Sequence, residues 1–250
     1  MACLFCRKPV DGSRIEHILP ESLGGGDWAC LPDGLVCANC NQYFGSKVES
    51  KALGSYPFLP FRLLLGIPTK HKKAPFMTTT LCTLKSSHKP GHIGLDPFSN
   101  EVEQGILRNE VTQVRIIAEP TEPLAGCRLL LKMGLELLGC EDGKANLSRY
   151  DAARKFARSP QKNSRWWFLI ACDFEGLFLR FKNGISLLEW QKGISLSIDD
   201  ACGGDVFHLK LFEMSLIVPL DEQIEASQDI RESGPEWQVF DVLVSGQTGK

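Results

Sequence analysis

The chain has 250 residues, with 28 basic and 30 acidic side chains and a formal net charge of −2. Hydrophobic residues make up 43% and charged residues 23%, values that exclude a disordered or collagen-like chain. The N-terminus lacks the pattern of a signal peptide, and no apolar run approaches the length of a membrane span, so we expect a soluble, cytoplasmic protein with no membrane contact.

The first part of the chain is rich in cysteine. Five of the ten cysteines lie in residues 1–40, and four of them form two Cys-x2-Cys pairs, Cys3/Cys6 and Cys37/Cys40. Four thiolates can hold a closed, tetrahedral structural zinc ion, and the alternative is four reduced cysteines in a small core. The residues Gly54-Ser55-Tyr56-Pro57 end a helical pattern, which predicts a first domain over 1–56 and a second over 57–250.

The middle of the chain predicts a β-rich run and a long helix. The run covers Met77–Leu84 and contains three consecutive threonines. The helix covers Leu124–Leu138, with leucines at helical spacing on one face and Gly139 as the residue that ends it. Three charged residues lie on the opposite face of this helix: Arg128, Lys132 and Glu136.

A short basic segment follows the long helix. Ser148 and Asp151 resemble a capping box that opens a second helix, and residues 149–165 hold six basic side chains and one acidic one. Such a segment can contact nucleic-acid phosphates, although a solvated face of mixed charge is the alternative. The candidate phosphate contacts are Arg149, Arg154, Lys155 and Arg158.

The last third of the chain predicts strands. We expect strands over Trp166–Asp173, Leu177–Lys182 and Ile185–Glu189, with Asn183-Gly184 as a hairpin turn, and a further, bent strand over Val206–Val218. The region 57–250 is therefore expected to be an α+β domain with a mostly antiparallel sheet.

A motif between the two cysteine pairs points to a family. The order Cys-x2-Cys, Glu16-His17-Ile-x-Pro, Gly24-Gly25, Leu35-Val-Cys-x2-Cys and Asn41-x3-Gly resembles the HNH endonucleases, also called the ββα-metal or His-Me finger class. The resemblance is to the branch with a four-cysteine zinc site, and it covers roughly residues 1–50. It implies two short strands, near Val10–Ile18 and Leu35–Val36, and a helix from about Ala38.

The resemblance also implies roles for three residues. Glu16 and Asn41 would bind a divalent ion, Mg²⁺ or Mn²⁺, while His17 would act as the general base that deprotonates the attacking water. Thiolates prefer zinc and oxygen ligands prefer hard ions, so zinc would bind the four cysteines and the divalent ion of the active site would bind Glu16 and Asn41. One departure stands out: Pro32, with Asp33 beside it, occupies the place of the family's central asparagine, which orients the catalytic histidine.

We therefore predict an α+β protein in which a small zinc-stapled HNH module precedes a larger α+β domain. Its predicted activity is metal-dependent hydrolysis of phosphodiester bonds in DNA, with RNA left open, in restriction, phage defence or mobile-element biology. One alternative is a non-catalytic zinc module that docks nucleic acid or protein. Another is a nuclease controlled by a ligand or partner protein bound to the C-terminal domain.

Overall fold

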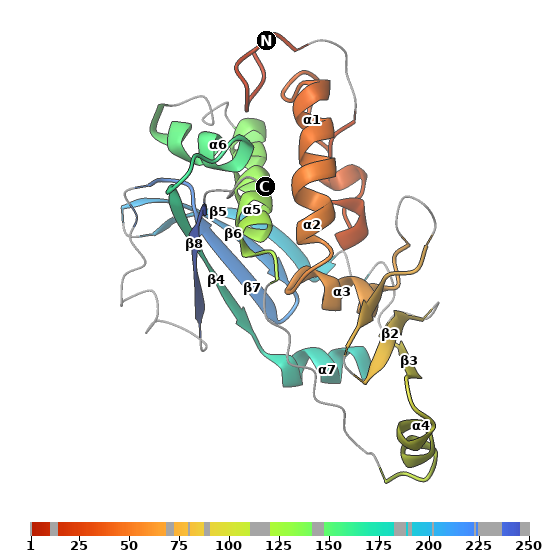
Figure 1. Ribbon diagram of the computed structural model, residues 1–250. Helices are drawn as coiled ribbons and strands as arrows, with labels where there is room; N and C mark the ends of the chain where they lie inside the picture. The colour runs from red at the N-terminus through yellow and green to blue at the C-terminus, as the bar shows by residue number, and fades with distance from the viewer. Residues whose placement is uncertain are drawn as a thin grey trace, which may run out of the picture.

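The structure is a computed structural model. It describes residues 2–10, 15–68, 73–79, 81–87, 91–110, 121–141, 148–182, 189, 192–201, 203–222, 224 and 237–245. Its central element is helix α5 (Pro123–Glu141), which packs on one face of a five-stranded sheet. The helical run of the N-terminal module lies along α5, and α6 (Asp151–Arg158) packs beside it (Figure 1). Because α5 contacts the sheet, the helical run of the module and α6, it joins the N-terminal module to the rest of the chain.

The N-terminal module has little regular strand. Its described residues form two isolated antiparallel bridges, Ala2 with Pro9 and His17 with Cys30. The strand implied at Leu35–Val36 does not form, and residues 11–14 of the strand implied near Val10–Ile18 lie outside the described residues. Its helices are η1 (Glu21–Leu23), η2 (Asp27–Ala29), α1 (Ala38–Phe44), η3 (Gly45–Glu49) and α2 (Ser50–Ala52). The last three form one continuous helical run, and its start at Ala38 confirms the predicted helix.

A small sheet follows the module. After α3 (Phe58–Leu65), strands β1 (Phe76–Thr78), β2 (Cys82–Ser86) and β3 (Ile93–Pro97) pair antiparallel in that order, and α4 (Asn100–Leu107) comes next. The β-rich run predicted over Met77–Leu84 is therefore two strands of a hairpin. The small sheet packs against α3, and α4 lies at the outer end of the molecule (Figure 1).

The main sheet is antiparallel throughout its described pairings, in the order β5-β6-β7-β4-β8. Its strands are β4 (Arg165–Cys172), β5 (Ile194–Ala201), β6 (Gly204–Leu211), β7 (Met214–Pro219) and β8 (Gln238–Leu243). The predicted strand Trp166–Asp173 corresponds to β4, where Trp166 and Trp167 are buried.

The remaining short helices are η5 (Ser148–Tyr150) and α7 (Phe174–Lys182). None of the described helices is long and apolar enough to cross a bilayer.

Two predicted strands were wrong. The segment Leu177–Lys182 belongs to helix α7, because Oδ1 of Asp173 accepts a hydrogen bond from the backbone N–H of Gly176 (3.0 Å) and caps a helix there. The strand predicted over Val206–Val218 is a hairpin of β6 and β7, which turns at Phe212 with φ 56°. No glycine, asparagine or proline marks that turn, so its sequence carries no turn signal.

Other predictions need smaller corrections. Helix α5 runs through Gly139 to Glu141 instead of ending at the glycine, and α6 begins at Asp151 without a capping side chain from Ser148. The turn predicted at Asn183-Gly184 and most of the strand predicted over Ile185–Glu189 lie outside the described residues.

The hydrophobic core is continuous across the predicted domain boundary. One cluster of buried side chains includes Phe44 and Val48 of the module, Leu131 of α5 and Phe207 of the sheet. The charged face of α5 is buried as well, with exposures of 8% for Arg128 and 0% for Lys132 and Glu136. That face packs against the module, which brings charged side chains of the larger region next to the HNH-like motif.

Candidate active site and zinc site

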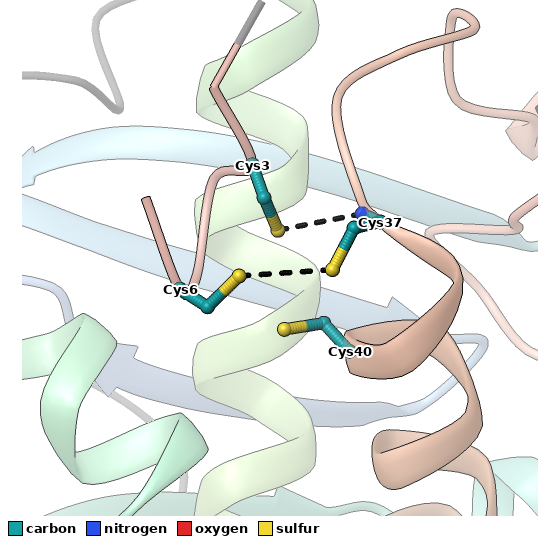
Figure 2. Close-up of side chains that lie close together, drawn as sticks. All are labelled: Cys3, Cys6, Cys37 and Cys40. Atoms are coloured by element: carbon teal, nitrogen blue, oxygen red, sulfur yellow. Dashed lines mark hydrogen bonds between the residues drawn. The ribbon is translucent and has the colours of Figure 1, made fainter. Parts of the chain in front are cut away.

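The four cysteines of the two Cys-x2-Cys pairs converge on one point. Cys3 and Cys6 lie in the N-terminal loop, and Cys37 and Cys40 lie at the start of α1 (Figure 2). The four Sγ atoms lie within 4.8 Å of one another, and those of Cys6 and Cys37 are 3.6 Å apart. Zn–S bonds of about 2.3 Å in a tetrahedron place sulfurs about 3.8 Å apart, so the cluster fits a structural zinc ion.

The surroundings of the cluster favour a thiolate at Cys3. Hydrogen bonding with Cys40 lowers the pKa of the Cys3 thiol to about 4, whereas the same contact raises the pKa of Cys40 and burial raises that of Cys37. The N–H of Cys37 donates to Sγ of Cys3 across 3.3 Å (Figure 2). Because a thiolate is the form that binds zinc, Cys3 is prepared for the metal, and the other three thiols would lose their protons as the ion binds.

Glu16 and His17 lie on a short extended segment that pairs with residues 29–31. The N–H of Ile18 donates to the carbonyl of Ala29, and the N–H of Leu31 donates to the carbonyl of Glu16, both at 2.8 Å. These bonds flank the bridge between His17 and Cys30 and hold the backbone of the motif in place.

The loop between the two paired segments turns tightly at its glycines. Gly24 has φ 91°, and a Cβ atom on Gly25 would lie 1.9 Å from the carbonyl oxygen of Leu19. A side chain at Gly25 would therefore force the loop apart. The glycine run serves this close approach, which brings residues 29–31 back beside the Glu16–His17 segment.

The side chain of His17 is 19% exposed, and its Nε2 lies 3.9 Å from Oε1 of Glu21 in η1. Glu21 is therefore the carboxylate nearest to the imidazole among the described ion pairs. The residues that replace the family's central asparagine, Pro32 and Asp33, are both exposed.

The carboxylate of Glu16 belongs to a largely buried charge cluster. Its Oε1 lies 2.8 Å from Nζ of Lys132, and the same Nζ lies 3.3 Å from Oε1 of Glu49 and 2.9 Å from Oε2 of Glu136. Burial alone would lower the pKa of Lys132, but these three carboxylates outweigh burial and raise it above its ordinary value. Lys132 is therefore a buried ammonium ion, paired with acidic residues from three segments.

Asn41 and Glu49 lie on the helical run that starts at the zinc cluster. Asn41, in the first turn of α1, is half-buried, and Glu49 ends η3 about two turns further on. Since Glu49 and Glu16 share Lys132, this run lies beside the Glu16–His17 segment. Asn39, between the last two cysteines, is exposed.

The four candidate phosphate contacts of the basic segment differ in their surroundings. Lys155 is exposed, and Arg149 is exposed but pairs with Asp205. Arg154 is 3% exposed and pairs with Asp151, while Arg158 lies over the Tyr43 ring, 3.6 Å from its centroid. Of the four side chains, those of Arg149 and Lys155 therefore face solvent.

Arg149 and Lys155 line an open hollow of about 570 Å³ with Arg165. The same hollow is lined by the acidic residues Asp151, Asp221 and Glu222, so its charge is mixed.

Sequence reasoning missed the residues that surround the motif. Lys132 and Glu136 are ordinary i,i+4 partners on a helix, and nothing local distinguishes them from an exposed ion pair. Their meeting with Glu16 depends on how α5 packs against the module, which no short motif encodes.

Comparison with known proteins agrees with the motif. Residues 3–56 match a family described as HNH endonuclease. No characterised protein and no solved structure matches the chain. The match covers the four cysteines, Glu16, His17, Asn41 and Glu49, and it ends before the larger sheet-containing region that holds Lys132.

Proposed function

We propose that this protein is a metal-dependent endonuclease that hydrolyses phosphodiester bonds in DNA, because residues 3–56 match the HNH endonuclease family. The observation that carries the proposal is the backbone pairing that holds the Glu16–His17 segment within the region of the four-cysteine cluster. The imidazole of His17 is partly exposed, and Lys132 links the neighbouring carboxylate to Glu49 on the helical run that also carries Asn41. A module that only docks a partner has no need of a base next to a carboxylate.

His17 is proposed as the general base. An imidazole is largely neutral at pH 7, so it can take a proton from a water molecule as that water attacks the phosphorus atom. The P–O bond to the leaving oxygen then breaks, that oxygen takes a proton from a water molecule, and the imidazolium ion returns its proton to solvent. Glu21, 3.9 Å from Nε2 of His17, is placed to stabilise the imidazolium ion that forms.

Glu16 and Asn41 are proposed as the ligands of a divalent ion. A carboxylate and an amide offer the oxygen atoms that Mg²⁺ and Mn²⁺ prefer, and Lys132 contacts one oxygen of Glu16, so the carboxylate has a second oxygen to offer. When bound, the ion would supply positive charge opposite the reacting phosphate. The four cysteines hold a separate, structural zinc ion in this proposal.

Arg149 and Lys155 are proposed as the phosphate contacts of the larger region, because they are the solvent-facing members of the four candidates. Phosphate contacts provide affinity that does not depend on sequence, so the target and the biological role in restriction, defence or mobile elements rest on further features of the chain.

The test is incubation of the full-length protein with supercoiled plasmid, single-stranded DNA and RNA in Mg²⁺, Mn²⁺ or EDTA. We expect cleavage of DNA with either ion and none with EDTA, with cleavage restored when Mg²⁺ is added in excess of the chelator. Cleavage that continues in EDTA would contradict the metal ligands. Absence of cleavage on every substrate with every ion would favour a docking module or a nuclease that needs a ligand.

A further inference from the structure

We propose that Lys132, which lies on α5 outside the HNH module, is a positioning residue of the nuclease centre. Its ammonium group holds the Glu16 carboxylate and the His17 backbone in their working arrangement. This inference rests on the roles proposed above for Glu16 and His17.

Lys132 contacts both residues of the motif directly. Its Nζ lies 2.8 Å from Oε1 of Glu16 and donates a hydrogen bond to the carbonyl oxygen of His17 across 3.3 Å. The first contact fixes one oxygen of the metal-binding carboxylate. The second fixes the peptide group that carries the base. A single nitrogen atom therefore fixes the positions of the metal ligand and the base relative to each other.

The same ammonium group also ties the module's helical run to the motif. Glu49, at the end of η3, lies 3.3 Å from Nζ, and Glu136 lies 2.9 Å from it on the other side. An ammonium group has three N–H bonds and finds four oxygen acceptors here, so its hydrogen-bonding capacity is fully used. Because Lys132 is 0% exposed, water cannot replace any of these acceptors.

The position of Lys132 is itself well determined. Its helix packs on the sheet with one face and on the module with the other, and the next charged residue on the same face, Arg128, is bonded to Tyr43 of α1 and to the carbonyl of Ala157 in α6. Two buried contacts one helical turn apart thus fix α5 against the module. Groups that orient a metal ligand affect metal affinity or activity by about 10- to 100-fold in other proteins.

A purely structural role makes a different prediction. If Lys132 only neutralises Glu136, replacing both together removes the ion pair and leaves the nuclease centre intact. If it positions Glu16, the same replacement frees Glu16 although both members of the buried pair are gone. The double variant Lys132→Met/Glu136→Gln separates these two roles, because it removes the pair on α5 and leaves Glu16 in place.

The experiment measures Mn²⁺ binding to the full-length protein by electron paramagnetic resonance, together with plasmid cleavage at saturating Mn²⁺. We expect the double variant to bind Mn²⁺ about 10-fold or more weakly and to have a kcat at least about 10-fold lower, with zinc content and KM for DNA unchanged. Glu16→Gln, which removes a proposed metal ligand, serves as the reference for the Mn²⁺ affinity expected when the site is lost. Arg128→Met, which removes the neighbouring buried cation of α5, should lower stability but leave Mn²⁺ affinity unchanged.

The outcomes separate this inference from the proposed function. Wild-type Mn²⁺ affinity and kcat in the double variant would overturn the positioning role, whereas weakened Mn²⁺ binding in a protein that cuts nothing would support that role and overturn the nuclease. A wild type with no Mn²⁺ site would overturn both. If the double variant loses zinc, Lys132→Gln/Glu136→Gln, whose amides can hydrogen-bond to each other, replaces it with the same expected result.

Discussion

Nζ of Lys132 and Oε2 of Glu136 lie 2.9 Å apart on consecutive turns of α5, and neither side chain is exposed to solvent. Removing one member of a buried pair leaves an uncompensated charge, which costs about 3–5 kcal/mol, whereas replacing both with neutral groups is often tolerated. We therefore expect Lys132→Met alone to lower the free energy of unfolding by about that amount and Lys132→Met/Glu136→Gln to recover part of it, since Glu16 and Glu49 still lose their cation in the double variant. Urea unfolding of the full chain measures both. A double variant as unstable as the single one would contradict this reading.

The zinc prediction concerns Cys37. A serine hydroxyl is a poor zinc ligand, so Cys37→Ser should lose the metal and expose the loop of Cys3 and Cys6 to proteolysis, because the ion is what links that loop to the start of α1. Elemental analysis should find about one zinc per chain in the wild type and almost none in the variant. Cys30→Ser is the matched control, because Sγ of Cys30 contacts the carbonyl of Gly26 and stands outside the cluster. Retention of zinc by the Cys37 variant would refute the assignment.

The metal-ligand prediction compares three substitutions. Glu16→Gln and Asn41→Ala should each reduce Mg²⁺-dependent cleavage severely, with partial recovery at high Mn²⁺, because each weakens an oxygen ligand. Asn39→Ala should have little effect, since that side chain is exposed between the zinc ligands. Cleavage rates over a range of Mg²⁺ concentrations measure the effect. Wild-type metal dependence in Glu16→Gln would remove Glu16 from the site.

Glu16→Gln is expected to keep its fold. Lys132 retains Glu136 and Glu49 as partners in this variant, at 2.9 and 3.3 Å. The amide of glutamine also offers Lys132 an oxygen acceptor in place of the carboxylate.

The DNA-contact prediction uses two neighbouring basic residues. Lys155→Glu should weaken binding to all DNA sequences alike and reduce the slope of log affinity against log salt by at least about 1, because a phosphate contact releases counterions. Arg154→Met should lower stability instead and leave that slope unchanged, since Arg154 is buried against Asp151. Filter binding at several salt concentrations distinguishes them. Equal slopes for Lys155→Glu and wild type would return this segment to an ordinary solvated face.

The sequence allowed the local features of the fold and the site to be predicted. The long helix over residues 124–138 and the antiparallel sheet follow from periodicity and composition, the family resemblance implied the helix from Ala38, and two cysteine pairs predicted the cluster that the structure contains. These features depend on spacing along the chain. Pattern and spacing are therefore enough to find them.

Features decided by packing or by an unusual residue could not be predicted. The apolar run after Asp173 is typical of a strand, yet the Asp173 carboxylate accepts a hydrogen bond from the N–H of Gly176 and so starts a helix. The hairpin turn at Phe212 has a left-handed residue that is not glycine. Lys132 reaches Glu16 across more than a hundred residues of sequence because α5 is buried on its charged face as well as on its apolar face.

The most direct test of the account is the rate at which His17→Ala cleaves supercoiled plasmid in Mg²⁺, measured beside the wild type. The substitution removes the proposed base and leaves the zinc cluster and the contacts of Lys132 with Glu16 and with the carbonyl of His17 in place. We predict a folded, zinc-loaded protein that binds DNA and Mn²⁺ normally and cleaves at least about 100-fold more slowly. Cleavage at the wild-type rate, still dependent on Mg²⁺, would contradict the assignment of His17 as the general base.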